Sequence, residues 1–379
     1  MSRSTTSRKN PVFFSFKNLL TAAAALLLFS SCEEFGDLIP RDPVETSEII
    51  QPEGPNPAWA PDIDPQMWAV VEQLGSYGTP PFPELSTQQA RMAPSFRDAA
   101  NDILKKFNIT PEPAAVQISQ RIIPNGTPEG LIARVYTPME GSGPFPVIVY
   151  YHGGGWVIAG PGTYESSAVA LAEKTGAVVV AVSYRQAPEF PFPTAHEDAF
   201  ATYQWARDSA AVINGDPERV ATAGESAGGN MSVAVALMAK EAGVEVPTHI
   251  VSVYPVADGD VESPSYDQYA DAAPLNRPAV IWFFDRYIPE WRTETYPRIS
   301  LADADLSGLP STTIINAEID PLESEGGDLA MQLESAGVPV TRKVYANVTH
   351  EFFGLNAILE QAEEAQNLAA KELKAAFEQ

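Results

Sequence analysis

Short runs of apolar, mostly β-branched residues alternate with amphipathic segments along most of the chain after residue 130. The apolar runs predict strands at 131–136, 147–151, 177–184, 220–223, 250–254, 312–317 and 338–345. The segments between them predict helices at 165–174, 195–208, 229–242, 325–336 and 356–377. A strand that is apolar along its whole length is buried on both faces, which is typical of parallel sheets covered by helices. The alternation therefore predicts an α/β fold with a mostly parallel central sheet.

Two segments interrupt this alternation. Residues 66–110 have a helical pattern broken by a Pro-rich turn at 80–83, and residues 258–294 form a Pro-interrupted insertion between two expected strands. We expect both segments to form a helical cap on a single α/β domain that spans 66–379. Their aromatic residues are expected to pack mostly within the cap rather than against a ligand: Trp68, Phe82, Tyr266, Trp282, Phe283, Phe284 and Trp291.

The N-terminus has the order of an export signal. Basic residues precede an apolar run at 19–29, which is too short to span a bilayer comfortably, and two serines then lead to Cys32, the only cysteine. This end resembles the lipobox of bacterial lipoproteins, although Phe29 stands where an aliphatic residue is more common. The pattern predicts a lipoprotein-type signal peptide at 1–31 and lipidation of Cys32. An ordinary cleaved signal followed by a free cysteine is the alternative.

Residues 33–65 are rich in proline and acidic residues, a composition typical of a linker that buries no core of its own. Together with the predicted signal, this linker predicts an exported protein, anchored by lipid to a membrane of a bacterial cell envelope and facing the periplasm or the surface. The membrane is then a partner only through the anchor at Cys32.

The charge balance argues against nucleic acid and anionic lipid as partners. The chain has 24 Lys and Arg against 49 Asp and Glu, which gives a formal net charge of −25. Such an acidic protein repels nucleic acid and anionic lipid, and it favours neutral or cationic substrates. The same charge is also explained by a solvated acidic surface alone.

A G-x-S-x-G motif carries the sharpest chemical signal. Gly224, Glu225, Ser226, Ala227 and Gly228 directly follow the expected strand at 220–223 and directly precede the expected helix at 229–242. The turn from strand to helix at such a motif is so tight that a Cβ on either glycine would clash, and it exposes the serine hydroxyl. The motif therefore predicts Ser226 as a nucleophile.

A second motif follows the strand at 147–151 and consists of His152, Gly153, Gly154, Gly155 and Trp156. Three glycines in a row let backbone N–H groups approach a carbonyl oxygen without side chains in the way. We expect an oxyanion hole made by the amides of Gly154, Gly155 and Ala227, with His152 orienting the loop. A flexible turn is the alternative.

The general base follows by elimination, because the chain has four histidines. His152 belongs to the glycine motif, His196 lies in a helix expected at the surface, and His249 begins an expected buried strand. His350 follows the last expected strand and precedes the last helix, which is where the α/β-hydrolase order Ser, acid, His requires the base.

The acid that orients the base is expected on a loop between these two residues. Asp320 comes just after the strand expected at 312–317 and is followed by proline. Glu318, Glu323 and Glu325 are nearby rivals, and helix capping is the alternative role for Asp320.

Four segments together resemble the bacterial hormone-sensitive-lipase-like esterases. They are HGGGW at 152–156, YRQAPEFPFPTAHEDA at 184–199, GESAGGN at 224–230 and DPL at 320–322. They occur in the family's order, and the resemblance extends from about residue 115 to the C-terminus. It implies an α/β-hydrolase core with a helical cap and the cofactor-free hydrolysis of short- to medium-chain acyl esters. Ser226, Asp320 and His350 align with the family's triad, and the HGGG glycines align with its oxyanion hole.

The chain departs from the family at two places. Glu351 follows His350 where the family usually has glycine, and DPL continues as ESEG rather than with a basic residue and Asp. A carboxylate beside the imidazole predicts a raised pKa of His350 and a higher pH optimum.

The sequence therefore predicts a serine hydrolase that cleaves carboxylic esters through an acyl-enzyme, without a metal or other cofactor. A small-molecule ester is the expected partner. Acylated carbohydrates or other environmental esters are inferred from the predicted location alone. A non-catalytic receptor would be expected to lack a triad residue, whereas amide or peptide hydrolysis by the same residues stays open.

Overall fold

The computed structural model of the chain describes residues 49–378. The predicted signal peptide at 1–31, the predicted lipidation site Cys32 and residues 33–48 of the predicted linker lie outside the described residues. Across 49–378, no helix is both long and apolar enough to cross a membrane.

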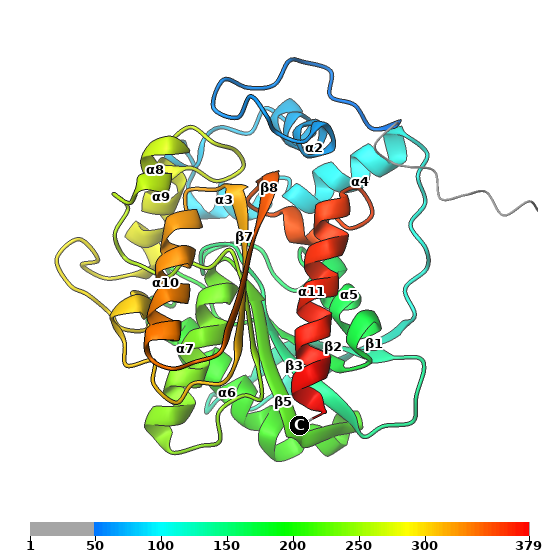
Figure 1. The fold of residues 1–379 in the computed structure, drawn as a ribbon, viewed down its shortest axis with the longest axis vertical. Coiled ribbons are helices and arrows are strands. Elements are labelled where there is room, and N and C mark those ends of the chain that lie inside the picture. The colour runs from blue at the N-terminus through cyan, green and yellow to red at the C-terminus, as the bar shows by residue number, and fades with distance from the viewer. Residues whose placement is uncertain (1–48, 379) are drawn as a thin grey trace, which may run out of the picture. The chain divides into compact units, whose positions relative to one another are not determined.

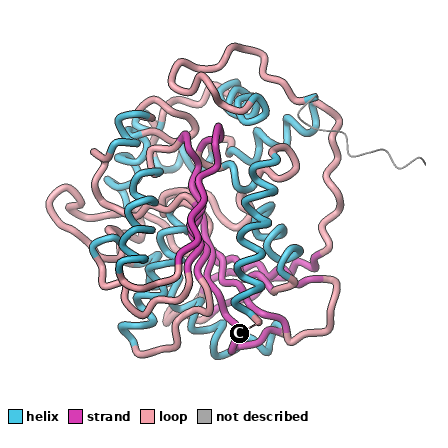
Figure 2. Tube along the Cα trace, viewed as in Figure 1, coloured by secondary structure: helices cyan, strands magenta, loops and turns pink. Residues whose placement is uncertain are grey.

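Eight strands form one sheet in the order β1-β2-β4-β3-β5-β6-β7-β8. Their bounds are Val116–Ile123 (β1), Leu131–Pro138 (β2), Phe145–Tyr151 (β3), Val178–Val182 (β4), Gly215–Glu225 (β5), Ile250–Val253 (β6), Thr312–Ile319 (β7) and Val340–Thr349 (β8). β2 is antiparallel to both neighbours, and every other pair is parallel. The mostly parallel sheet expected from the apolar runs is confirmed. Figure 2 shows its strands at the centre of the fold, with helices around them.

Helices cover both faces of the sheet. One face carries α5 (Glu165–Thr175) and α11 (Glu360–Phe377), and the other carries α6 (Thr194–Ser209), α7 (Ala227–Ala242) and α10 (Glu323–Ser335) (Figure 1). Side chains alternate along a strand, so β3 serves both layers: Ile148 packs in the core beneath α5 and α11, and Val149 packs in the core beneath α6 and α7. Both side chains are fully buried, as parallel strands covered on two sides require.

Further helices lie over the end of the sheet towards which β7 and β8 point (Figure 1). They are α2 (Pro65–Ser76), α3 (Thr87–Met92), α4 (Phe96–Lys106), α8 (Pro264–Gln268) and α9 (Arg277–Tyr287), with the 3-10 turn η1 (Phe82–Glu84). Side-chain oxygens of Asp64, Ser95 and Asn276 accept hydrogen bonds from the first-turn N–H groups of α2, α4 and α9. These caps satisfy donors that the helices leave unpaired, so the sequence itself fixes where each helix begins.

The packed core begins earlier than the predicted linker allows. Ile50 and Ile63 are buried in the same core cluster as α2 and α4, and the backbone N–H of Asp64 donates to Asn347 O at 2.8 Å. The Pro- and acid-rich composition of 33–65 predicted a linker, although the segment contains two isoleucines whose burial stabilises the fold. The described part of that segment is therefore a portion of the folded body rather than a linker.

Several elements differ from expectation: β5 begins at Gly215 rather than at residue 220, and β8 ends at Thr349 rather than at residue 345. β1 was not predicted, because its central residues alternate between half-buried and exposed and include polar ones, which is typical of an edge strand rather than a buried one. α11 begins at Glu360 rather than near residue 356, because the 3-10 turn Phe352–Gly354 follows the end of β8.

Candidate active site

Ser226 lies in the tight turn between β5 and α7. Its φ of 58° and ψ of −120° place it in a region that side-chain-bearing residues rarely adopt. A Cβ on Gly224 would lie 2.2 Å from the carbonyl oxygen of Gly228, and a Cβ on Gly228 would lie 1.9 Å from that of Tyr151. The predicted steric reason for both glycines therefore holds in the structure.

His350 and Asp320 meet at the ends of β8 and β7. The Nδ1 atom of His350 lies 2.7 Å from Asp320 Oδ2, and both residues are almost fully buried. Asp320 Oδ1 accepts the backbone N–H of Leu322 at 2.9 Å, which fixes the carboxylate. Burial lowers the pKa of His350, but the charge and hydrogen bond of Asp320, with smaller contributions from Glu351 and Glu225, outweigh burial and raise it.

The rival carboxylates for the acid are engaged elsewhere. Glu318 accepts the backbone N–H of Asn347 at 2.8 Å, and Glu323 forms an ion pair with Arg342. Glu325 is buried and accepts the N–H groups of residues 257 and 258. Among the acidic candidates from the sequence, Asp320 is the one that the structure joins to His350.

The other three histidines are buried and serve the structure. The ring of His152 stacks on Tyr184 with centroids 4.1 Å apart, and burial lowers its pKa to about 4. Burial likewise lowers the pKa of His249, which directly precedes the buried strand β6, to about 4. Tyr184 also donates its hydroxyl to His152 O at 2.9 Å, which holds the start of the glycine loop.

The expected surface position of His196 is wrong. Its side chain is fully buried, and its ring nitrogens lie 2.7 Å from Tyr287 Oη and 2.8 Å from Asn230 Oδ1. The neighbouring acids of the helix suggested exposure, but Tyr287 comes from the distant α9 and covers this side of α6.

The glycine motif forms a loop at the end of β3. Gly154 and Gly155 have φ of 97° and 57°, and a Cβ on Gly155 would lie 2.3 Å from the ring of Phe283. A Cβ on Gly153 would lie 2.3 Å from Tyr164 Oη. Only glycine fits such a loop. Trp156 ends the motif as a fully buried side chain stacked on Tyr287, with centroids 4.7 Å apart.

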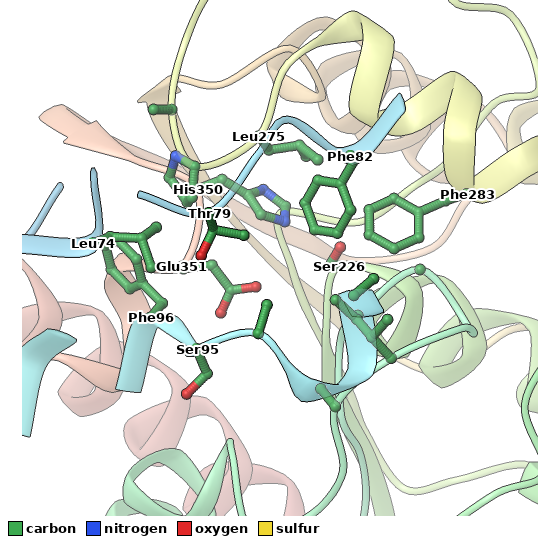
Figure 3. A pocket seen from close by; sticks show the side chains of 18 of the residues that line it. Leu74, Thr79, Phe82, Ser95, Phe96, Ser226, Leu275, Phe283, His350 and Glu351 are labelled. Atoms are coloured by element: carbon green, nitrogen blue, oxygen red, sulfur yellow. The ribbon is translucent and has the colours of Figure 1, made fainter. Parts of the chain in front are cut away.

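A cavity of about 1360 Å³ brings the predicted residues together. Its wall contains Ser226, His350, Gly154 and Gly155, and Ala227 follows Ser226 as the first residue of α7. Figure 3 shows the Ser226 hydroxyl and the His350 ring at the same cavity. In residues 49–378, no hydrogen bond joins these two side chains, a contact that commonly closes only around a bound substrate.

The cavity wall has an apolar side next to Gly155. Phe82 and Phe283 lie there with ring centroids 5.0 Å apart, and Leu275 lies near them (Figure 3). All seven aromatics named from the sequence pack against the hydrophobic core, and four of them also line this cavity: Trp68, Phe82, Phe283 and Phe284. The remaining ones, Tyr266, Trp282 and Trp291, lie outside its wall.

Glu225, the second residue of the G-x-S-x-G motif, is buried beneath the site. Tyr150 and Tyr254 each donate a hydroxyl to its carboxylate. Burial and the nearby Glu351 charge raise the pKa of Glu225 to about 7. The ring of Tyr254 also lies 4.5 Å from the His350 ring, centroid to centroid. Glu225 therefore supports the base through a tyrosine, a link that the motif alone did not indicate.

Glu351 lies beside His350 with its carboxyl group at the cavity. Its φ of 74° is the backbone conformation that glycine adopts easily, which is consistent with the glycine of the related family. Tyr164 donates its hydroxyl to Glu351 Oε1 at 2.6 Å. No sequence pattern pointed to Tyr164, because its partner is 187 residues away along the chain.

Comparisons with known proteins agree with this geometry. A family model described as the alpha/beta hydrolase fold matches residues 148–354. The carboxylesterase NlhH of Mycobacterium tuberculosis is 34% identical over 322 residues, covering 84% of this chain and 97% of that protein. An ethyl acetate hydrolase of Pseudomonas putida is 33% identical, covering 60% of this chain and 72% of that protein.

Solved structures give the same result. A thermostable esterase from Pseudomonas putida superimposes with a TM-score of 0.77 at 32% identity, covering 84% of this chain and 98% of its own. A hyperthermophilic esterase from the archaeon Pyrobaculum calidifontis superimposes with a TM-score of 0.73 at 34% identity, covering 81% and 96%. The predicted fold and family are confirmed, and the chain belongs to the hormone-sensitive-lipase-like family of α/β-hydrolase-fold serine esterases.

Proposed function

We propose that this esterase works through an acyl-enzyme, with Ser226 as nucleophile, His350 as general base and Asp320 as the residue that orients His350. One observation carries the proposal: Ser226, in a strained turn, and His350 share the wall of one cavity, and His350 is paired with the buried Asp320 behind it. Strained backbone is concentrated at active sites, and a serine nucleophile needs an adjacent base that a third group orients.

The chemistry then runs in two steps. Ser226 Oγ attacks the ester carbonyl and passes its proton to His350 Nε2, and collapse of the tetrahedral intermediate returns that proton to the departing alcohol. Water, deprotonated by the same imidazole, then attacks the acyl-enzyme, and collapse of the second tetrahedral intermediate releases the acid while the imidazolium returns its proton to Ser226 Oγ. Asp320 accepts the Nδ1 hydrogen of His350 at 2.7 Å, which holds the tautomer and stabilises the imidazolium.

The oxyanion of each intermediate is proposed to bind the N–H groups of Gly154, Gly155 and Ala227. Positive φ values turn the two glycine amides out of the β3 direction, and Ala227 is the first residue of α7. The N-terminus of that helix adds partial positive charge where negative charge develops. Loss of one such donor typically costs on the order of 3 kcal/mol in the transition state.

The acyl group is proposed to occupy the apolar side of the cavity, against Phe82, Leu275 and Phe283. These side chains adjoin Gly155, and an acyl carbonyl seated in the oxyanion hole would point its chain towards them. A wall of this size and polarity supports acyl chains of short to medium length.

A lipid-anchored, exported location is a separate proposal that rests on residues 1–32. This segment has basic residues first, then an apolar run and then Cys32, which is the order that lipoprotein processing requires. An exported position would give the enzyme access to acylated carbohydrates or other environmental esters. Metabolic labelling with a radioactive fatty acid tests it: label should enter the wild-type chain and be absent from Cys32→Ser.

Hydrolysis of p-nitrophenyl acetate, butyrate, octanoate and palmitate by the purified full chain tests the catalytic proposal. We expect turnover of the shorter esters and a loss of several orders of magnitude in kcat for Ser226→Ala. A burst of p-nitrophenol equal to the enzyme concentration would identify the acyl-enzyme. Equal rates for wild type and Ser226→Ala would overturn the proposal.

A further inference from the structure

Glu351 places an acidic side chain at the cavity directly after His350, where the related family usually has glycine. Within residues 49–378, its carboxylate accepts a side-chain hydrogen bond only from Tyr164. The rest of the chemistry proposed above uses no charge at this position. A carboxylate at the edge of a partly apolar cavity acts on whatever part of the substrate lies beside it.

The leaving alcohol is that part. His350 must return a proton to the departing oxygen, so the alcohol lies on the imidazole side of Ser226. The acyl side is next to Gly155 and Phe283, at the other end of the glycine loop. In the view of Figure 3, Glu351 lies on the opposite side of Ser226 from Phe283. Glu351 therefore faces the alcohol half of the substrate.

Aromatic side chains accompany this carboxylate. Tyr164 adjoins Gly153 and bonds to Glu351, and Phe96 and Trp68 line the cavity wall as well. Figure 3 places Phe96 beyond Glu351, on the side away from Ser226. A carboxylate next to aromatic rings is the combination that binds a substituted ammonium group, through charge attraction and cation–π contacts.

The wider wall favours a cation too. Two guanidinium groups line the cavity, but Arg91 is paired with Glu189 at 2.7 Å and Arg97 with Glu165 at 3.2 Å. Four carboxyl groups line the same wall: Glu72, Glu84, Asp98 and Glu351. The formal net charge of −25 adds a long-range attraction for cations.

We propose that Glu351 is a specificity-determining residue that favours esters whose leaving alcohol carries a positive charge, such as an alkylammonium group. This inference rests on the proposed function, because it needs the alcohol to lie beside His350. It concerns selectivity between substrates rather than the bond-breaking step, so the two can fail independently.

A pair of isosteric esters tests the proposal. Acetylcholine and 3,3-dimethylbutyl acetate have the same shape, but a quaternary nitrogen in the first replaces a quaternary carbon in the second. The quantity measured is the ratio of kcat/KM for the cationic ester to that for the neutral one, at pH 8 to favour the ionised form of Glu351. We expect the ratio to fall roughly tenfold in Glu351→Gln. Glutamine keeps the size and still accepts the Tyr164 hydrogen bond.

Two further variants make the result interpretable. Glu84→Gln removes the same charge from the wall next to Phe82, on the acyl side, and should keep the wild-type ratio. Glycine readily adopts the φ of 74° found at Glu351, so Glu351→Gly should fold even if Glu351→Gln does not. Its kcat/KM ratio of cationic to neutral ester should fall as it does in Glu351→Gln. An unchanged ratio in both Glu351 variants, or an equal fall in Glu84→Gln, would overturn the inference.

Inhibition of the wild type supplies a check that needs no variant. Choline and 3,3-dimethylbutanol are the two alcohols of the ester pair, and choline should be the stronger competitive inhibitor of p-nitrophenyl acetate hydrolysis. Equal inhibition constants would count against the inference. Hydrolysis of p-nitrophenyl acetate at the same rate by wild type and Ser226→Ala would instead overturn the proposed function.

Discussion

Gly228 and Tyr151 approach so closely that a methyl group on the Gly228 α-carbon would lie 1.9 Å from the carbonyl oxygen of Tyr151. We expect Gly228→Ala to lower the free energy of unfolding by about 2–3 kcal/mol, because backbone atoms on both sides would have to move. Denaturant unfolding measures this. Gly75→Ala is the matched control, since a Cβ there meets nothing within 4 Å and α2 should gain about 0.5–1 kcal/mol.

The backbone strain at Ser226 predicts a trade between activity and stability. Ser226→Gly should raise the free energy of unfolding by about 1–2 kcal/mol, because glycine adopts φ 58° and ψ −120° without strain. Ser226→Ala keeps the strain and should not gain. Both variants lose ester hydrolysis, so the comparison of their unfolding curves isolates the backbone. Equal stability of the two would show that the turn stores no strain.

Removing the Asp320 carboxylate, which is hydrogen-bonded to His350, should change both the rate of ester hydrolysis and its pH profile. The neutral imidazole is the active form, so kcat/KM rises with pH through the pKa of His350. Asp320 raises that pKa, so Asp320→Asn should move this rise to lower pH and reduce kcat by roughly 10³–10⁴. Glu318→Gln, which changes an acid bonded to Asn347, is the control. A similar loss in the control would transfer the role away from Asp320.

Removing the Glu351 carboxylate should shift the pH profile of kcat/KM in the same direction as Asp320→Asn, but by less. Its charge also raises the pKa of His350, after the larger contributions of Asp320. In Glu351→Gly, the rise of kcat/KM with pH should move to lower pH, by less than in Asp320→Asn. We therefore expect the wild-type pH optimum to be higher than that of the glycine variant. A pH–rate profile that coincides with the wild type would remove this role.

Glu225 predicts a pH dependence of stability. In the unfolded chain it ionises near its ordinary value of 4.5, whereas burial holds its proton in the folded chain up to about 7. Folding therefore takes up a proton between these values, and stability falls as pH rises through that window. Between pH 5 and pH 8, Glu225→Gln should gain about 2–3 kcal/mol relative to wild type. A difference that does not change with pH would contradict the buried, protonated state.

The sequence predicted the sheet and the site where local pattern decides them. The apolar run that became β3 could only be a strand buried on both faces, and the glycines around Ser226 have no other steric purpose. β1 was not predicted, because its mixed polar and apolar sequence lacks the continuous apolar run of a buried strand. The burial of His196 was not predicted, because Tyr287, which covers it, is 91 positions away along the chain.

The cavity itself could not be predicted, because its wall is assembled from segments far apart in the chain. Phe82 and Phe283 are partners across some two hundred residues, and so are Tyr164 and Glu351. Hydrophobic periodicity assigns each of these residues to an element, but it does not say which elements meet. The charge at Glu351 was visible in the sequence, whereas its neighbours were not.

The order in which the site residues occur along the chain has a consequence for timing. Ser226 is synthesised well before Asp320 and His350, and the Phe283 wall also follows it. A growing polypeptide therefore contains its serine before His350, the proposed base, has been made. Under the proposed mechanism, hydrolytic competence arrives only with the last strand and the loop that carries His350, so we expect a nascent chain to leave cellular esters intact until its synthesis is nearly complete.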